Sequence, residues 1–432
     1  MHLNKENITD YARLTSVKTD KFKSSVISFS MTLPLTKEFF AHNLLLSHLL
    51  RRGTKNHPST ALLNKRLDEL YGSYVEVKSH RIGENISLNI TAEFLDSKYS
   101  PDGTDVFGEI VSIASELILS PAFLQNDFNP SFFEQEKKLI CEAIDAEINN
   151  TRVYAAKRCA EIMQENTDIP SSKELKKLIL DATLDSMLEY HTHLTTQAPI
   201  NIFYVGSQDE ALTKSKLESA FSSYPFKSAS SLIFPRPLHR DVTLELSEKM
   251  PVSQGKLALG FSIGAVIDKN SDECYTAMML NEILGGSASS KLFLNVREKL
   301  SLCYYCSSSF SIYSGVILVS SGFEVKNYTI ARQAIFDQIN DIKQGKISDA
   351  EILAAKRSIT SSYRQLYDSP FDLQAFYGDR ALFGISDGID DTVSKLLSVS
   401  KEDIVRLAQG IKLDASYFIE GTLDSETEED YE

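Results

Sequence analysis

The order of the predicted secondary-structure elements occurs twice in this chain, and this repeat constrains the fold more than any other feature of the sequence. Each half reads as a strand, a helix, a turn, a second helix with serine at its N-cap, and a hairpin of two strands. A shift of 230 residues places Tyr74 on Tyr304, and it places the strand containing Ile86 on the strand containing Val316. We therefore predict two domains of the same kind.

The stretch between the halves, Ser222–Arg240, contains serine, proline and lysine without helical or strand periodicity, and we interpret it as a linker. The predicted domains are then 1–221 and 241–423, followed by an acidic tail at 424–432. Hairpins and amphipathic helices alternate in both halves. The predicted fold class is α+β, with two tandem homologous domains that each form a mostly antiparallel sheet covered by helices.

Two long helices are predicted within the first domain. Apolar residues recur at helical spacing from Phe132 to about Glu165, and again from Leu175 to Thr192. We expect each stretch to form one continuous helix.

The charge of the chain argues against two classes of partner. Acidic residues outnumber basic ones 59 to 45, which gives a net charge of −14. Residues 424–432 hold six acidic and no basic residues, so without this tail the net charge rises from −14 to −8. A body this acidic is a poor general binder of nucleic acid and of anionic membranes, and we expect neither as a partner. The tail itself is expected to be a solvated extension.

The cysteines and the N-terminus point to a cytoplasmic location. The first residues lack the apolar core of a signal peptide, and no run approaches the roughly 18 apolar residues of a membrane span. The five cysteines are few and odd in number, as expected in a reducing compartment. Cys303 and Cys306 form a Cys-x-x-Cys pair that could indicate redox or zinc chemistry. No second pair accompanies it, and the residues around it alternate like a strand, which is the interpretation we favour.

One predicted helix, Glu38–Arg52, carries His48 in an otherwise apolar sequence. A helical zinc site needs a second imidazole four residues away and a carboxylate that activates the metal-bound water. Leu44 and Ser47 stand at those two positions. His42 lies about 240° around the helix from His48 and cannot share a metal with it. We therefore predict neither a metal nor a cofactor.

Two pairs of residues in the second half admit both a functional and a structural interpretation. Gly285 and Gly286 could open a phosphate-binding turn, but the lysine of a P-loop is missing. The better interpretation is that the glycines end one helix and that the serines after them begin the next. Arg297 at a helix end and Tyr304 at a strand start could converge as hydrogen-bond donors on one anionic or carbonyl oxygen. The alternative is an ordinary exposed arginine and a packed tyrosine.

Five segments together resemble one protein family, the pitrilysin/insulinase-type zinc peptidases, which include the mitochondrial processing peptidases. The segments are 47–54, 70–72, 136–144, 284–286 and 297–304, and the resemblance extends over nearly the whole chain. It is strongest to the non-catalytic members of Gram-positive bacteria, which are linked to 5-aminopentanol modification of elongation factor P. The resemblance implies a fold like that of the mitochondrial processing peptidases.

The resemblance also identifies the positions of the family's zinc site. Active members carry His-x-x-Glu-His in the first helix, and here those positions are Leu44, Ser47 and His48. The distal zinc-binding glutamate corresponds to Ala143, whereas a supporting glutamate corresponds to Glu136. The resemblance therefore implies a chain without zinc.

The second domain of the family contributes an arginine and a tyrosine, seven residues apart, which bind the substrate backbone and stabilise the tetrahedral intermediate. Arg297 and Tyr304 match this pair. The implied function is that of a metal-free subunit, which encloses a peptide or unfolded protein segment and supplies both residues in trans to a homologous zinc-bearing subunit. The alternative is a non-proteolytic scaffold or a maturation factor for elongation factor P modification. The sequence leaves open whether the chain forms homodimers.

Overall fold

The structure, a computed structural model, describes residues 3–126, 128–165 and 167–423. The predicted acidic tail at 424–432 lies outside the described residues. The chain divides into two compact units, and each unit is built from three separate segments. Unit 1 comprises 1–144, 168–234 and 366–384, and unit 2 comprises 145–167, 235–365 and 385–432.

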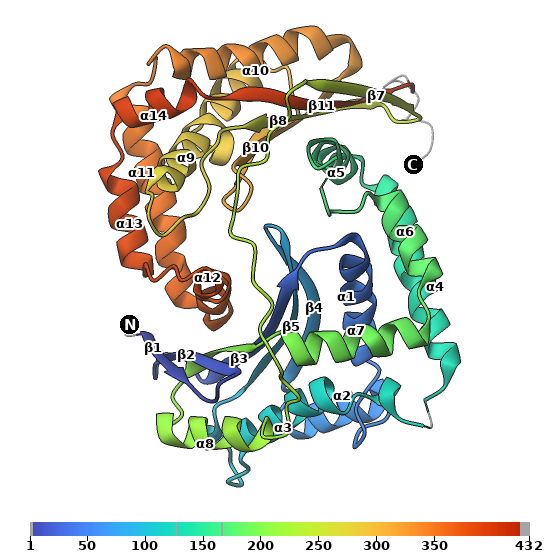
Figure 1. Ribbon diagram of the computed structural model, residues 1–432. Coiled ribbons are helices and arrows are strands. Elements are labelled where there is room, and N and C mark those ends of the chain that lie inside the picture. Colours follow the sequence, from blue (N-terminus) through green and yellow to red (C-terminus); the bar gives the residue numbers. More distant parts are fainter. Residues whose placement is uncertain (1–2, 127, 166, 424–432) are drawn as a thin grey trace. The chain divides into compact units, whose positions relative to one another are not determined.

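Unit 1 contains a six-stranded sheet with the order β1-β2-β6-β3-β5-β4 (Figure 1). The β2–β6 pair is parallel, and the other pairs are antiparallel. The strands are β1 (Leu3–Asn7), β2 (Ala12–Lys18), β3 (Ser24–Pro34), β4 (Tyr74–Ile82), β5 (Asn85–Leu95) and β6 (Ile200–Gly206).

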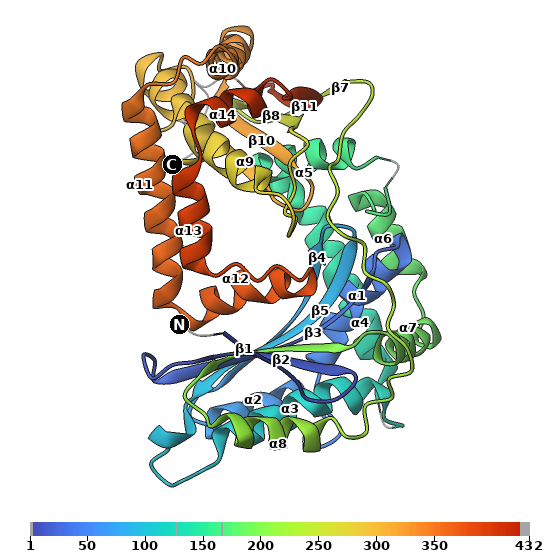
Figure 2. The ribbon, with the colours of Figure 1, turned by 60° about the vertical axis from the view of Figure 1, so that its left-hand side comes forward.

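The two faces of this sheet are covered differently. The apolar side chains of one face pack against a layer of helices that forms the main core of the unit. The opposite face carries a single helix, α12, on which Tyr377 stacks against Phe203 of β6 with ring centroids 5.9 Å apart. Figure 2 shows the sheet between α12 and the layer that contains α2, α3 and α8. The helices are α1 (Lys37–Leu50), α2 (Thr60–Glu69), α3 (Val106–Leu119), α6 (Ser172–Asp181), α7 (Leu184–Gln197), α8 (Glu210–Ala220) and α12 (Pro370–Leu382).

Unit 2 contains a five-stranded sheet with the order β7-β11-β8-β10-β9. The β7–β11 pair is parallel, and the other three pairs are antiparallel. This is the order and direction of β2-β6-β3-β5-β4 in unit 1, so the repeat seen in the sequence is present in the sheet topology. The strands are β7 (Leu244–Met250), β8 (Gln254–Ser262), β9 (Tyr305–Ser311), β10 (Val316–Glu324) and β11 (Lys412–Gly421).

The second sheet is also covered on both faces. Leu257, Leu259 and Phe261 of β8 point into a helical layer, whereas Ala258 on the other face packs against a single helix, α5. Strand alternation produces this division, because successive side chains point to opposite faces. The helices are α5 (Thr151–Met163), α9 (Glu273–Asn281), α10 (Tyr328–Lys343), α11 (Asp349–Gln365), α13 (Ile389–Ser398) and α14 (Lys401–Ala408).

The predicted α+β class is thus confirmed, with two sheets covered by helices. The packing units do not follow contiguous stretches of chain, however. The segment 145–167, which we predicted to lie in the first domain, packs in unit 2 as α5, and the segment 366–384 packs in unit 1 as α12. Each unit therefore takes the helix on one face of its sheet from the opposite half of the sequence.

Both predicted long helices are wrong, because each is interrupted. The first divides into α4 (Pro130–Ala146) and α5, and Asn150 caps the second piece by accepting a hydrogen bond from the backbone N–H of Val153. The second divides into α6 and α7, where Thr183 and Ser186 form a capping box. In both cases a polar side chain satisfies the first free backbone N–H groups of a new helix.

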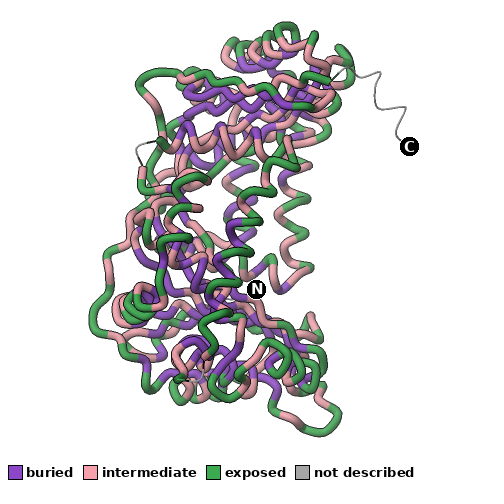
Figure 3. Tube along the Cα trace, turned by 90° about the vertical axis from the view of Figure 1, so that its right-hand side faces the viewer, coloured by how far each residue is buried: buried purple, intermediate pink, exposed green. Residues whose placement is uncertain are grey.

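The buried residues lie mainly along the strands and on the helix faces that meet them, as the coloured trace in Figure 3 shows. No helix in the described ranges combines the length and the apolar character that a membrane crossing requires.

Candidate functional site

The positions of the family's first zinc motif lie on α1 in unit 1. Thr36 caps this helix by accepting a hydrogen bond from the backbone N–H of Phe39. Leu44 is partly buried and packs against the core of the unit. The Ser47 hydroxyl donates a hydrogen bond to the Leu44 carbonyl at 2.7 Å, so it is engaged within the helix itself. His48 lies in the last turn and is partly exposed.

His48 belongs to a cluster centred on the carboxylate of Glu136 in α4. His48 Nδ1 lies 2.9 Å from Glu136 Oε2, and Arg52 Nε donates to Glu136 Oε1 at 2.5 Å. The Arg52 guanidinium also lies over the Phe132 ring, 4.9 Å from its centroid. The Glu136 side chain is only 8% exposed. Both oxygens of the Glu136 carboxylate therefore have a hydrogen-bond partner within the same chain.

The charge of Glu136 is stabilised by these partners. Burial opposes ionisation, but the hydrogen bond from His48 and the charge of Arg52 outweigh it and hold the pKa of the Glu136 carboxyl below its ordinary value. The sequence predicted Glu136 as a supporting residue but missed its pairing with Arg52. The four-residue spacing of His48 and Arg52, which places both on one face of a helix, could have indicated the pairing.

The residues present do not fit a zinc ion. Zinc in proteins takes nitrogen, sulfur or carboxylate oxygen ligands, and a catalytic site supplies three of them. Leu44 and Ala143 offer no donor, and Ala143 is an exposed residue of α4. The two remaining residues, His48 and Glu136, are hydrogen-bonded to each other. Within the described residues there is no group of three or more His, Cys, Asp or Glu side chains that could hold a metal ion.

The other histidines of α1 and those of α7 have structural partners. His42 Nε2 lies 3.3 Å from the Ser186 hydroxyl, and burial lowers the pKa of its ring. His191 is buried with Nε2 2.7 Å from the Ile118 carbonyl. His193 lies against the Phe39 ring with centroids 5.0 Å apart. From these contacts we interpret the three histidines as packing residues.

Arg297 lies in unit 2, on the π-helical segment Leu292–Lys299. Its guanidinium lies over the Phe293 ring at 4.6 Å from the centroid, and 3.5 Å separates it from the exposed carboxylate of Glu298. The side chain is 39% exposed. Segments of π-helix are rare and are frequently found at functional sites.

Tyr304 immediately precedes the edge strand β9. Its backbone N–H donates to the Gly322 carbonyl at 2.8 Å, which holds the chain in the sheet, whereas the residue is 54% exposed. Its hydroxyl makes no hydrogen bond within the described part of the chain. Between the π-helical segment and Tyr304, Ser301 has a φ of 51°, a left-handed conformation that is unusual for a residue with a side chain. No hydrogen bond or cation–π contact joins Arg297 to Tyr304 among the described residues.

The glycine pair and the Cys-x-x-Cys pair are explained by packing. A Cβ on Gly285 would lie 2.6 Å from the backbone nitrogen of Ser308, so this glycine permits close approach to β9 and does not form a phosphate cradle. Cys303 and Cys306 are free, buried thiols, and the Ser321 hydroxyl donates to Cys303 Sγ at 3.1 Å. The strand interpretation of this motif is confirmed, because Cys306 lies in β9.

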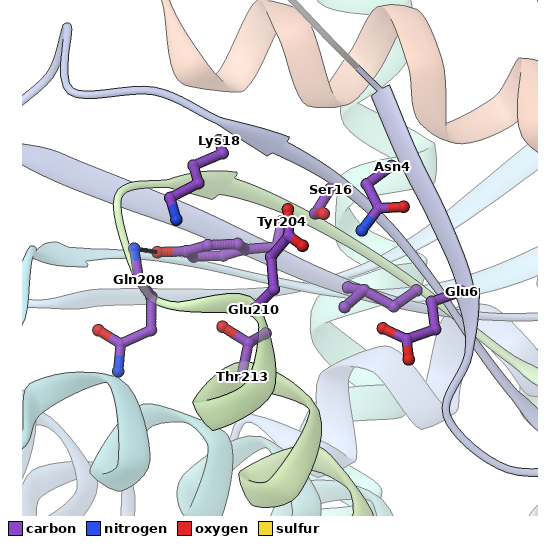
Figure 4. A pocket seen from close by; sticks show the side chains of 9 residues that line it. Asn4, Glu6, Ser16, Lys18, Tyr204, Gln208, Glu210 and Thr213 are labelled. Atoms are coloured by element: carbon purple, nitrogen blue, oxygen red, sulfur yellow. Dashed lines mark hydrogen bonds between the residues drawn. The ribbon is translucent and has the colours of Figure 1, made fainter.

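The edge strand β4 of unit 1 has an open cavity on each of its faces, which sequence reasoning missed. One cavity, of about 400 Å³, lies between β4 and α2 and has a mixed lining, with apolar residues such as Leu63 and Leu67 and polar ones such as Asn64 and Asp68. The other, of about 360 Å³, lies between β4, β5 and α12 and has a polar lining. A further hollow between β1, β2, β6 and α8 (Figure 4) has a volume of only about 10 Å³, which is space for one water molecule.

The chain is similar in sequence to several known proteins. Residues 181–359 match the family described as "Peptidase M16 inactive domain". The "Probable inactive metalloprotease YmfF" of Bacillus subtilis is 31% identical over 412 residues, which cover 94% of this chain and 95% of that protein. The "Uncharacterized zinc protease YmxG" of the same organism is 26% identical over 228 residues, covering 52% of this chain and 54% of that protein.

Solved structures share the fold over nearly the whole chain. A conserved protein from Enterococcus faecalis V583 superposes with a TM-score of 0.86 at 25% identity, and 97% of this chain and 99% of that chain are covered. A peptidase M16 inactive domain from Pseudomonas fluorescens superposes with a TM-score of 0.80 at 14% identity, with 98% and 99% covered.

Proposed function

This chain belongs to the M16 peptidase family as an inactive metalloprotease homologue, and from that premise we propose that it is the metal-free subunit of a two-subunit peptidase. A homologous zinc-bearing subunit supplies the hydrolytic centre. This chain encloses the peptide or unfolded segment and supplies Arg297 and Tyr304 in trans. The similarity to a protein named as an uncharacterized zinc protease supports the existence of such a homologous partner.

One observation carries the proposal: the zinc positions are filled by internal contacts, whereas the donor pair is left available. Glu136 is saturated by His48 and Arg52. In contrast, the Arg297 guanidinium has a 3.5 Å ion pair with an exposed glutamate and a stacking contact with Phe293, and Tyr304 is 54% exposed. An arginine and a phenol are suited to donate to a carbonyl oxygen as it gains negative charge, and such donors are most effective where water is excluded.

The edge strand β4 supports a role in peptide binding. It pairs with β5 on one side and forms the last strand of the sheet on the other. The free N–H and C=O groups of an edge strand can pair with an extended peptide, and flanking cavities then receive its alternate side chains. The two cavities beside β4 provide this arrangement.

The test is reconstitution with a candidate zinc-bearing homologue and a quenched fluorescent peptide. We expect activity from the mixture but not from this chain alone, and we expect Arg297→Ala combined with Tyr304→Phe to reduce kcat by about 100-fold, as removal of an oxyanion donor does. Arg406→Ala and Tyr99→Phe serve as matched controls, because both residues are exposed and lie outside the proposed site.

Undiminished turnover by the double variant would overturn the donation in trans. A complex that forms stably but leaves every peptide uncut would instead identify this chain as a non-proteolytic scaffold.

A further inference from the structure

The polar cavity beside β4 is built from two elements of unit 1 that face each other. Glu76 and Lys78 of β4 stand directly opposite Thr91 and Asn89 of β5, on one face of the sheet. Across the cavity, α12 presents a row of residues spaced three and four apart along one helix face. This row consists of Asp372, Ala375 and Asp379.

The row on α12 makes the cavity acidic. Ala375, the small middle residue, leaves space between two carboxylates. Asp379 is paired, since its Oδ2 lies 2.9 Å from His80 Nε2. Asp372, which is exposed, forms no ion pair within the described residues.

The strand side of the cavity does not neutralise this charge. The Lys78 ammonium already lies 2.8 Å from the Glu76 carboxylate, so these two charges cancel each other. His80 neutralises Asp379 only when it is protonated. The cavity therefore retains at least the one uncompensated negative charge of Asp372.

The two faces of β4 differ in chemistry. Val75 and Val77 point to the opposite face, where leucine and valine side chains and polar ones such as Asn64 and Asp68 together line the second cavity. A peptide that pairs with β4 sends its side chains alternately to the two faces. One set would enter the mixed cavity beside α2, and the other would face the carboxylates of α12.

From this geometry we infer that the cavity between β4 and α12 selects a lysine or arginine side chain in the peptide that pairs with β4. The inference rests on the proposed peptide-binding function and adds to it a substrate class, namely extended segments that contain a basic residue. Asp372 and Asp379 are the selecting residues, and the long stem of lysine or arginine spans the cavity.

The experiment measures the affinity of three fluorescein-labelled octapeptides for the full chain at low ionic strength. Each alternates valine and threonine, and one central threonine is either kept or replaced by lysine or glutamate. A single lysine can reach the α12 cavity, because an extended peptide can slide along the edge strand by two residues. We expect the lysine peptide to bind about fivefold more tightly than the threonine peptide, and the glutamate peptide to bind most weakly.

Variants of the two carboxylates test the assignment. Asp372→Asn combined with Asp379→Asn should abolish the preference for lysine, and Asp372→Lys should shift it toward glutamate. Asp349→Asn, at an exposed carboxylate in the first turn of α11, serves as the charge-matched control and should leave the preference unchanged.

The outcomes separate the two claims. If none of the three peptides binds, the peptide-binding function fails. If all three bind with equal affinity, or if the lysine preference persists in the double variant, the inference about the α12 cavity fails while peptide binding stands.

Discussion

At the scale of single residues, Glu136 shows how the remains of the zinc motif have become structural. In the family pattern this glutamate supports a metal site, and here its oxygens are bound by His48 and Arg52. A buried carboxylate is costly unless it is paired, and removal of one member of such a cluster leaves the others without a partner. The cluster therefore stabilises unit 1 only while all three residues are present.

Glu136→Gln is predicted to lower the free energy of unfolding by about 1–3 kcal/mol at pH 7, the range for losing a charged, buried hydrogen-bond acceptor. Folding lowers the pKa of Glu136 from its ordinary value of 4.5, so the ionised form stabilises the fold above that value, and this contribution is lost as the pH falls through the lowered pKa. Urea unfolding at pH 7 and pH 3.5 should show a smaller pH effect in the variant than in the wild type. Equal loss of stability from Glu142→Gln, at an exposed residue, would argue against this account.

The His80–Asp379 pair predicts how peptide binding depends on pH. The hydrogen bond that His80 donates to Asp379 raises the pKa of His80 above 6.5, despite its partial desolvation and the nearby charges of Arg81 and Lys78. This pair stabilises the fold at pH values below 6.5, the ordinary pKa of histidine. The contribution is lost as the pH rises through the raised pKa of His80. Above that pKa, His80 is neutral and the Asp379 charge is free.

The affinity for the lysine peptide should therefore increase between pH 6 and pH 8.5, whereas the affinity for the threonine peptide should stay constant. Fluorescence anisotropy across this range measures both. His80→Gln should remove the pH dependence, and a pH profile that survives this substitution would assign it to another group.

At the scale of elements, sequence pattern predicted those segments whose environment is uniform along their length. The helix predicted at Glu38–Arg52 is observed as α1 within two residues at each end, because its apolar residues recur at helical spacing along its length. The interruptions at Asn150 and Thr183 were missed, since the apolar pattern continues through both while a polar cap begins a new helix. The identity of β4 as an edge strand also depends on long-range pairing, which local patterns do not contain.

The candidate site divides in the same way. Arg297 and Tyr304 were predicted from a local motif, since the two residues lie only seven positions apart in the sequence. The zinc positions Leu44, Ser47 and Ala143 were likewise identified by motif. The α12 cavity could not be predicted, because its two walls lie about 290 residues apart in sequence and no local signal connects Lys78 with Asp372.

A second π-helical segment, Glu282–Gly286, provides a test of element packing. A Cβ on Gly285 would meet the backbone nitrogen of Ser308 at 2.6 Å, and backbone cannot move aside as a flexible side chain can. Gly285→Ala is predicted to destabilise the protein by about 1–3 kcal/mol through overpacking. Gly410→Ala, whose nearest neighbour would lie at 3.4 Å, should change stability much less. Thermal unfolding of both variants compares them, and equal melting temperatures would contradict the close-packing argument.

At the scale of the whole molecule, each unit depends on a segment from the other half of the sequence. Unit 2 needs α5, whose Met163 and Cys159 lie against Gly260 so closely that a Cβ there would meet Met163 Sδ at 2.3 Å. Unit 1 needs α12, which covers β6 through the Phe203–Tyr377 stack. The two homologous halves are thus similar in topology but not independent as folding units.

A chain divided after Phe234 should show this dependence. We expect the fragments 1–234 and 235–432 each to lack a cooperative unfolding transition when expressed alone, because each lacks the helix that covers one face of its sheet. Co-expression should restore a cooperative transition. A cooperative transition with native-like melting temperature in either isolated fragment would contradict the exchange of helices.

The central claim is that this chain cannot hold a hydrolytic metal by itself. Its most direct test is the zinc content of the purified chain after incubation with excess zinc and gel filtration, measured by inductively coupled plasma mass spectrometry. The variant Leu44→His/Ser47→Glu/Ala143→Glu, which returns the family's donors to α1 and α4, serves as the comparison and should gain zinc. We predict far less than one zinc ion per wild-type chain. One zinc ion per wild-type chain that is lost in His48→Ala would contradict the account.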